Sequence, residues 1–150
     1  MAKADTAEEL FREGLNCCQS VYCAFAEEMG LTPAEAAKKS SPFGAGFGKL
    51  REVCGAVTGM VMVLGEMEGY SDPKDSQGKK ELYEKVRQLC NQFEESEGSI
   101  ICRELLGLKK GEELEEPAIR PANYYEIRPC LKACRRAAEI LECHLIKNAL

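Results

Sequence analysis

The apolar residues of this chain recur at helical spacing, and this periodicity is the feature that most restricts its fold. Residues 80–96 and 129–148 carry apolar side chains three or four positions apart, which places them on one face of a helix. No run of Val, Ile and Thr alternates with polar residues between turn signals, as a half-buried strand would require. The sequence therefore predicts an all-α protein. The apolar positions are Leu82, Tyr83, Val86, Leu89, Cys90 and Phe93 in the first stretch, and Leu131, Cys134, Ala138, Leu141 and Leu145 in the second.

Capping residues indicate where the helices begin. Asn16 is followed three positions later by Gln19, the pattern of a capping box, and Thr32 precedes a proline at a first helical position. We expect a single-domain bundle of about five to seven helices over residues 1–150, with an irregular arm over residues 109–125. The predicted helices cover residues 7–13, 17–29, 33–39, 51–67, 80–96, 100–106 and 129–148.

A glycine-rich loop precedes the predicted helix at 51–67. Three glycines fall within residues 44–48. Glycine lacks a Cβ and tolerates positive φ, so such a loop lets the backbone approach a ligand closely. Gly46, Gly48 and the helical Gly55 are therefore candidate cofactor-contacting positions.

Charge and hydropathy exclude several classes of partner. The net charge is -5 and the chain has no Trp, so no basic stripe or aromatic platform for nucleic acid is present. The longest apolar run, residues 60–64, is far too short to cross a membrane, and residues 1–7 contain no apolar signal-peptide region. We expect a cytoplasmic protein that binds neither nucleic acid nor membrane. The sequence leaves open whether the protein forms a homodimer.

The chain contains nine cysteines, which is many for a protein expected in a reducing compartment. In the cytosol, such an excess points to metal binding, catalysis or transient redox chemistry rather than to structural disulfides. Free cysteines also pack as small apolar residues, which we expect for roughly half of them. They are Cys17, Cys18, Cys23, Cys54, Cys90, Cys102, Cys130, Cys134 and Cys143.

Four of these cysteines fall at predicted helix starts: Cys17, Cys54, Cys102 and Cys130. Helix N-termini carry partial positive charge and unpaired amide donors, which favour thiolate over thiol. Thiolates are both nucleophiles and metal ligands. Four thiols at four helix starts could converge on a cluster, on a tetrahedral metal or as exchanging dithiols. Next to the glycine loop, Cys54 is the predicted exposed thiol.

The remaining cysteines are predicted to be core-filling or incidental surface residues. Cys134 is the exception, because it lies four residues after Cys130 and shares its helix face. It could serve as a resolving thiol or an extra ligand. Whether Cys18 takes part is also open.

Four segments together resemble the C-GCAxxG-C-C family. They are residues 16–19, residues 52–59 with the core Cys-Gly-Ala-x-x-Gly, residues 99–107, and the terminal helix that opens at Cys130. The glycine loop at 43–48 is also similar, and the likeness extends from about residue 8 to about residue 141. The core here reads Cys-Gly-Ala, whereas the family's label reads Gly-Cys-Ala. Cys18 occupies a position where the family usually has Ala.

The resemblance implies redox activity and assigns the family cysteines to Cys17, Cys54, Cys102 and Cys130. A related domain in a split-Soret type cytochrome further implies iron–sulfur binding. This chain lacks a Cys-x-x-Cys-His haem attachment site.

Three functions stay open on the sequence alone. The first is an iron–sulfur cluster, or zinc, held by the four family thiolates. The second is dithiol–disulfide exchange through Cys54 and Cys102 without metal. The third is a non-enzymatic helical module that senses metal or binds a partner. Whether the protein is an oxidoreductase or an electron carrier, and which redox partner it uses, is not specified by the sequence. His144 is the single histidine, which argues against histidine-based catalysis.

Overall fold

A computed structural model describes residues 1–115, 117 and 119–149, and its described part is all-α, as predicted. Parts of the predicted 109–125 arm, Glu116 and Ala118, and the C-terminal Leu150 lie outside the described residues. The helices exceed the predicted five to seven because two four-residue helices, α4 and α8, form in segments predicted as loops. In chain order they are α1 (Lys3–Arg12), α2 (Cys17–Ala24), α3 (Pro33–Ser40), a 3-10 turn (Ser41–Phe43), α4 (Gly44–Phe47), α5 (Gly55–Glu68), α6 (Ser76–Glu97), α7 (Cys102–Leu106), α8 (Tyr124–Ile127) and α9 (Cys130–Ala149).

The predicted capping box is present at the start of α2, and the predicted Thr32 cap of α3 proves to be part of a second capping box. The Gln19 amide donates to Asn16 Oδ1 at 2.8 Å, and the Asn16 amide donates to Gln19 Oε1 at 3.0 Å. Thr32 and Glu35 make the same reciprocal pair before α3. Four predicted ends are wrong. Helix α1 begins at Lys3 rather than at residue 7, and α2 ends at Ala24, where turns replace the predicted helix. Helix α5 begins at Gly55 rather than at residue 51, and α6 begins at Ser76 rather than at residue 80.

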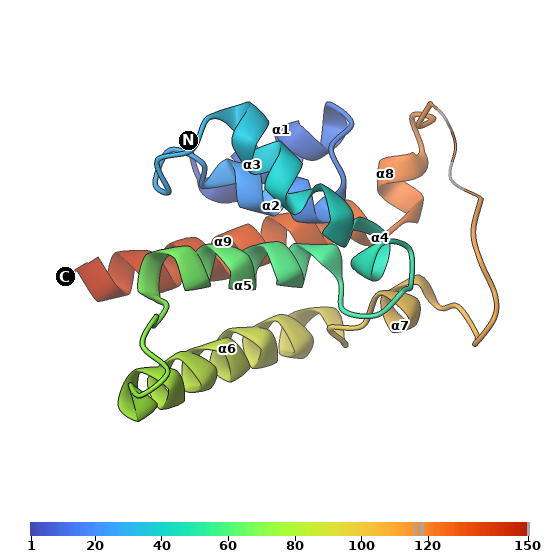
Figure 1. Cartoon of the computed structure of the whole chain (residues 1–150). Helices are drawn as coiled ribbons and strands as arrows, with labels where there is room; N and C mark the ends of the chain where they lie inside the picture. The colour runs from blue at the N-terminus through green and yellow to red at the C-terminus, as the bar shows by residue number, and fades with distance from the viewer. Residues whose placement is uncertain (116, 118, 150) are drawn as a thin grey trace.

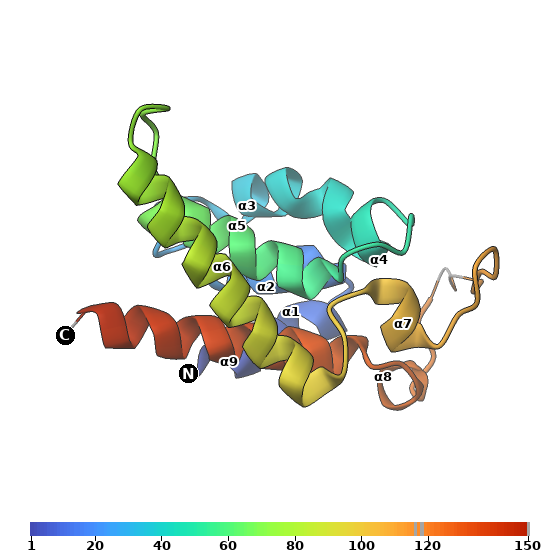
Figure 2. The ribbon, with the colours of Figure 1, turned by 90° about the horizontal axis from the view of Figure 1, so that it is seen from below.

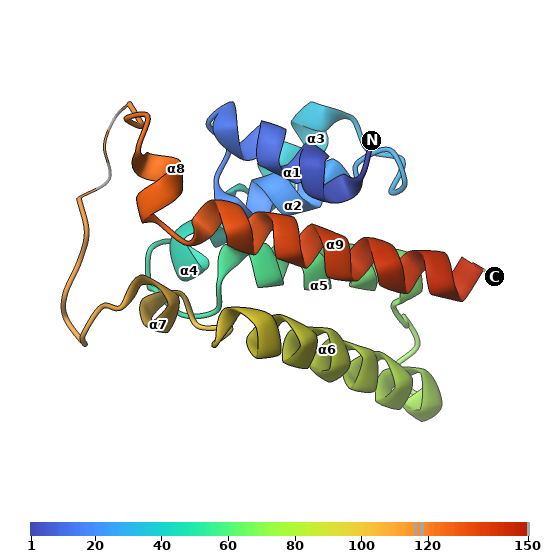
Figure 3. The ribbon, with the colours of Figure 1, turned by 180° about the vertical axis from the view of Figure 1, so that it is seen from behind.

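The long helices pack in layers. Helix α9 lies beside α5 along its length, with α1 and α2 on one side of this pair and α6 on the other (Figures 1 and 3). Both chain ends lie at the same end of the molecule in Figure 1. No helix among the described residues combines the length and apolarity needed to cross a bilayer.

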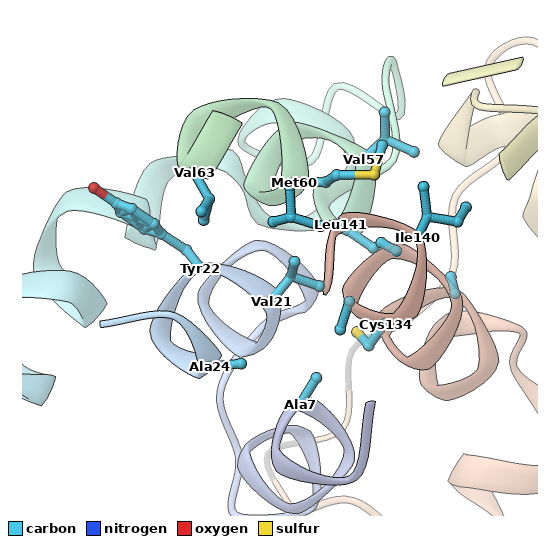
Figure 4. Packing of buried hydrophobic residues seen from close by; sticks show 14 of the residues in the cluster. Ala7, Val21, Tyr22, Ala24, Val57, Met60, Val63, Cys134, Ile140 and Leu141 are labelled. Atoms are coloured by element: carbon cyan, nitrogen blue, oxygen red, sulfur yellow. The ribbon is translucent and has the colours of Figure 1, made fainter. Parts of the chain in front are cut away.

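The core forms where α1, α2, α5 and α9 meet (Figure 4). Val21, Met60 and Leu141 are completely buried there, and the Cys134 sulfur lies among them. Burying one such side chain contributes about 1.5–3 kcal/mol. Helices α2 and α5 approach closely because Gly59 has no Cβ; one placed there would lie 2.8 Å from the Cys18 carbonyl oxygen.

Helix α6 buries less of its apolar face than predicted. Leu89 and Phe93 are buried, but Leu82, Val86 and Cys90 are only half-buried and Tyr83 is 48% exposed. The N-terminal half of α6 diverges from α9 and crosses α5 (Figure 2). Leu82 and Val86 in this half pack only partly against the core, whereas Leu89 and Phe93 in the C-terminal half are buried.

One end of the bundle gathers the short elements. Helices α4, α7 and α8 lie together there, beside the starts of α5 and α9 (Figures 1 and 2). This end therefore brings segments that are far apart in sequence to one place, and it contains the candidate site.

Candidate thiol site

Each of the four family cysteines lies at the start of a different helix, as predicted. Cys17, Cys102 and Cys130 are the first residues of α2, α7 and α9, and Cys54 directly precedes α5. Helix starts present amide donors and partial positive charge.

A short backbone pairing joins two of these helix starts. Val53 and Ile101 form an isolated antiparallel bridge. The Cys54 amide donates to the Ile100 carbonyl at 2.7 Å, and the Cys102 amide donates to the Glu52 carbonyl at 2.6 Å. Residues 52–54 are therefore extended, not helical as predicted, and this pairing holds the starts of α5 and α7 side by side.

All four family cysteines line one pocket of about 100 Å³. That space is several times what one water molecule requires. Among the described residues, the lining includes no carboxylate and no imidazole. It is instead made of the four cysteines, three arginines (Arg51, Arg120 and Arg128) and mainly apolar residues such as Phe11, Leu105, Leu106 and Tyr124.

Two of the three candidate glycines allow close approach within the site. A Cβ on Gly55 would collide with the Cys17 sulfur, so the missing side chain lets Cys17 reach the start of α5. A Cβ on Gly46 would lie 2.6 Å from the Cys102 Cβ and 2.7 Å from the Arg51 Cα. Gly55 lines the pocket. From the glycine loop, the residue that lines the pocket is Ala45, not Gly46 or Gly48.

The glycine loop has an unusual backbone. Five successive residues, 45–49, have positive φ, three of them not glycine: Ala45 (57°), Phe47 (74°) and Lys49 (70°). The Gly48 amide donates to the Gly44 carbonyl at 3.0 Å, so the segment forms a left-handed turn. Such a conformation costs about 1–2 kcal/mol for each non-glycine residue. Retained strain of this kind is typical of functional sites.

Burial outweighs the helix-start effect on the thiols. Cys54 is 6% exposed, which corrects the prediction that it is the exposed thiol. Burial, and next the charge of Cys17, raise the pKa of Cys54 well above its usual value, although the Ala56 and Val57 amides act in the opposite direction. Burial likewise raises the pKa of Cys102, against the opposing hydrogen bond from Arg51. The predicted lowering of these two pKa values is wrong because desolvation is the larger effect.

Arg51 is a site residue that sequence reasoning missed. Its side chain is 2% exposed, its Nη1 donates to the Cys102 sulfur at 3.8 Å, and its Nε and Nη2 donate to Glu113 Oε1 at 2.9 and 2.6 Å. Its φ of 60° turns the chain at the end of the strained loop. Arg51 lies three residues before Cys54, but no motif signals that a charged residue in a loop is buried.

Arg120 was also missed, and it fastens the segment before α8 over the pocket. It donates to the carbonyls of Phe11 and Leu15, and its guanidinium stacks 4.3 Å from the centre of the Phe11 ring and 5.1 Å from that of Tyr124.

The other cysteines divide into buried and peripheral residues. Cys18 and Cys134 are fully buried, whereas Cys23 and Cys90 are half-buried and Cys143 is exposed. The Cys134 thiol donates to the Cys17 carbonyl at 3.7 Å, which places it directly behind the pocket. Cys18 instead contacts the Met62 sulfur at 3.8 Å in the core.

The thiols share a pocket without forming a finished metal site. In the described part of the chain, no three Cys, His, Asp or Glu side chains are close enough together to hold a metal ion. The described cysteines form no disulfide. Binding a metal would therefore require the pocket thiols to move toward one another.

Comparison with known proteins gives one family. A family model described as "Putative redox-active protein (C_GCAxxG_C_C)" matches residues 15–143. The chain belongs to this family. Neither the curated proteins nor the solved structures include a match. Within this C_GCAxxG_C_C protein, the matched region contains all four pocket cysteines.

Proposed function

We propose that this C_GCAxxG_C_C protein is a redox protein whose Cys17, Cys54, Cys102 and Cys130 thiolates hold a soft metal centre, an iron–sulfur cluster first of all. The observation that carries the proposal is that these four thiols, from four helix starts, line one pocket that no described carboxylate or imidazole lines. A donor set made of thiolates alone suits iron–sulfur clusters, Zn²⁺ and Cu⁺, and is a poor match for Mg²⁺ or Ca²⁺.

The charges around the pocket support an anionic centre. Four thiolates bring more negative charge than a bound metal neutralises, and buried charge is costly unless it is compensated. Arg51, Arg120 and Arg128 line the same pocket, and the starts of α5 and α9 add partial positive charge. A metal also replaces the thiol protons, which removes the penalty of ionising buried thiols.

The surrounding residues would bind and shield the centre. Phe11, Leu105 and Leu106 line the pocket and limit the access of water. Cys17 and Cys130 are half-buried, whereas Cys54 and Cys102 are buried. When bound, an iron–sulfur cluster supplies one-electron transfer.

Anaerobic purification followed by an absorbance spectrum, iron analysis and acid-labile sulfide analysis tests the proposal. We expect broad visible bands and matched iron and sulfide, which are lost when Cys17, Cys54, Cys102 or Cys130 is changed to Ser. Cys143→Ser is the matched control, because its thiol is exposed and does not line the pocket. If the protein instead contains zinc and has no visible absorbance, the four-thiolate site stands and its metal is zinc. Metal that survives all four changes would reject the proposal.

A second candidate is dithiol–disulfide exchange without metal. Its support is that Cys17, Cys54, Cys102 and Cys130 line one pocket. Within it, the Cys17 sulfur lies against Gly55, the residue that follows Cys54. If the purified protein holds no metal, oxidation by a disulfide reagent should remove thiols in pairs, and peptide mapping should find the bridge within the pocket. A bridge outside it, or no bridge, would reject this candidate.

A further inference from the structure

Arg51 is a buried cation in the wall of the thiol pocket, and no part of the family label includes it. Its side chain is 2% exposed and lines the pocket together with Cys102. A buried guanidinium is costly unless it is paired and hydrogen-bonded, so a chain that keeps one there has a use for its charge or its donors.

The guanidinium is shared between a sulfur and a carboxylate. Nη1 donates to the Cys102 sulfur at 3.8 Å, while Nε and Nη2 donate to Glu113 Oε1 at 2.9 and 2.6 Å. Glu113 belongs to the segment between α7 and α8, and its side chain is 39% exposed. Arg51 therefore couples a site thiol to a carboxylate at the surface.

The backbone is strained at the residue that presents this guanidinium. Arg51 has a φ of 60°, in the left-handed region that β-carbon-bearing residues rarely adopt. Its amide donates to the Ala45 carbonyl at 3.4 Å, and its carbonyl accepts from the Arg103 amide at 3.1 Å. Strain kept at a functional site usually has a mechanistic role, and here it accompanies a guanidinium placed against Cys102.

We propose that Arg51 is a positioning residue that raises the reduction potential of the Cys102 centre, and that Glu113 moderates this effect. The redox role of Cys102 comes from the function proposed above, but the inference holds for either kind of centre. One electron added to a thiolate-held metal centre increases its negative charge. In the metal-free case, two electrons and one proton convert one S–S bond into one thiol and the Cys102 thiolate. Reduction adds negative charge at the Cys102 sulfur in both cases, and a positive charge with an N–H donor there favours the reduced form.

Equilibrium redox titration of the full-length protein tests the inference. The variants are Arg51→Met, Arg51→Lys and Glu113→Gln, with Glu112→Gln as the matched control, because it makes the same charge change at the neighbouring exposed residue. A metal-loaded protein is titrated with dithionite and followed by absorbance, and a metal-free protein is titrated in dithiothreitol buffers and followed by thiol counting.

The two partners of the ion pair should shift the equilibrium in opposite directions. For Arg51→Met, we expect the equilibrium constant to shift about tenfold toward the oxidised form, which is the effect of losing one hydrogen bond to a charged group. For Glu113→Gln, we expect a shift toward the reduced form. Arg51→Lys should recover part of the loss because it restores the charge. A merely structural role would not produce shifts of opposite sign.

The outcomes separate this inference from the proposed function. If the unmodified protein shows a redox couple but Arg51→Met and Glu113→Gln leave it in place, or shift it the same way, only the role of Arg51 is rejected. If Arg51→Met does not fold, the test rests on the redox equilibrium of Glu113→Gln compared with that of its Glu112→Gln control. An unmodified protein with neither metal nor a redox-active thiol pair would reject both.

Discussion

Cys54 and Cys102 lie on the same face of a single antiparallel bridge, at the starts of two helices 48 positions apart in sequence. Their amides donate to the carbonyls of Ile100 and Glu52, which makes the two cysteines diagonal neighbours. One antiparallel bridge therefore holds two of the four pocket thiols in a fixed relationship in the wall of the pocket.

The close contact between Gly55 and Cys17 predicts a position-specific cost of adding a methyl group. Gly55→Ala should lower the free energy of unfolding by about 1–3 kcal/mol, because its Cβ would collide with the Cys17 sulfur and overpack the site. Gly65→Ala in the same helix is the control: its Cβ meets nothing within 4 Å, so it should stabilise the protein by up to about 1 kcal/mol. Urea denaturation measures both. Equal effects at the two positions would contradict the packing described here.

The capping box before α2 predicts a link between helix stability and the site. Asn16→Ala removes the cap directly before Cys17, as well as the hydrogen bond from Asn16 Nδ2 to the Ser41 carbonyl at 3.0 Å. It should cost about 0.5–2 kcal/mol of stability and also reduce the metal retained after gel filtration.

Thr32→Ala removes an equivalent capping box before α3, and Thr32 does not line the pocket. It should cost a similar amount of stability and leave metal retention unchanged. Equal metal loss in both variants would show that retention reports only global stability.

The Glu68 carboxylate predicts a pH-dependent contribution to stability. Although burial alone would raise its pKa, hydrogen bonds from Lys85 at 2.7 Å and His144 at 3.0 Å lower it below the usual value. A lowered folded-state pKa stabilises the protein above the unfolded value, about 4.3, and this contribution disappears as the pH falls through the folded-state pKa.

Glu68→Gln should therefore lower the free energy of unfolding by about 1–3 kcal/mol at pH 7, and by progressively less below about pH 4. Urea unfolding followed by circular dichroism at pH 7, 5 and 3 measures the difference from the unmodified protein. Glu84→Gln, on the exposed face of α6, is the control and should have little effect at any pH. If the difference in free energy of unfolding between Glu68→Gln and the unmodified protein stays constant with pH, the charge of Glu68 does not have this role.

Features determined by local sequence were predictable. The helix starts at Cys17 and Pro33 follow from capping residues within three positions, and the all-α class follows from the periodicity of the two long amphipathic segments. The placement of four cysteines at helix starts was predictable for the same reason.

Features determined by tertiary contacts were not predictable. The pairing of residues 51–54 with 100–103 depends on two segments that are far apart in the chain, and it converts a predicted helical turn into extended backbone. The burial of Cys54 and Arg51 depends on what covers them. The left-handed backbone at Phe47 and Lys49 is contrary to the preferences of those residues, so no propensity would indicate it.

Metal-edge X-ray absorption on anaerobically purified protein tests the central claim most directly, because it counts the sulfur atoms bound to the metal. We predict four sulfur ligands, at about 2.3 Å if the metal is zinc, and no nitrogen or oxygen ligand. Cys143→Ser should leave this shell unchanged, whereas Cys102→Ser should disrupt it. A shell dominated by nitrogen or oxygen, or one that Cys102→Ser leaves unchanged, would contradict a four-thiolate centre in this pocket.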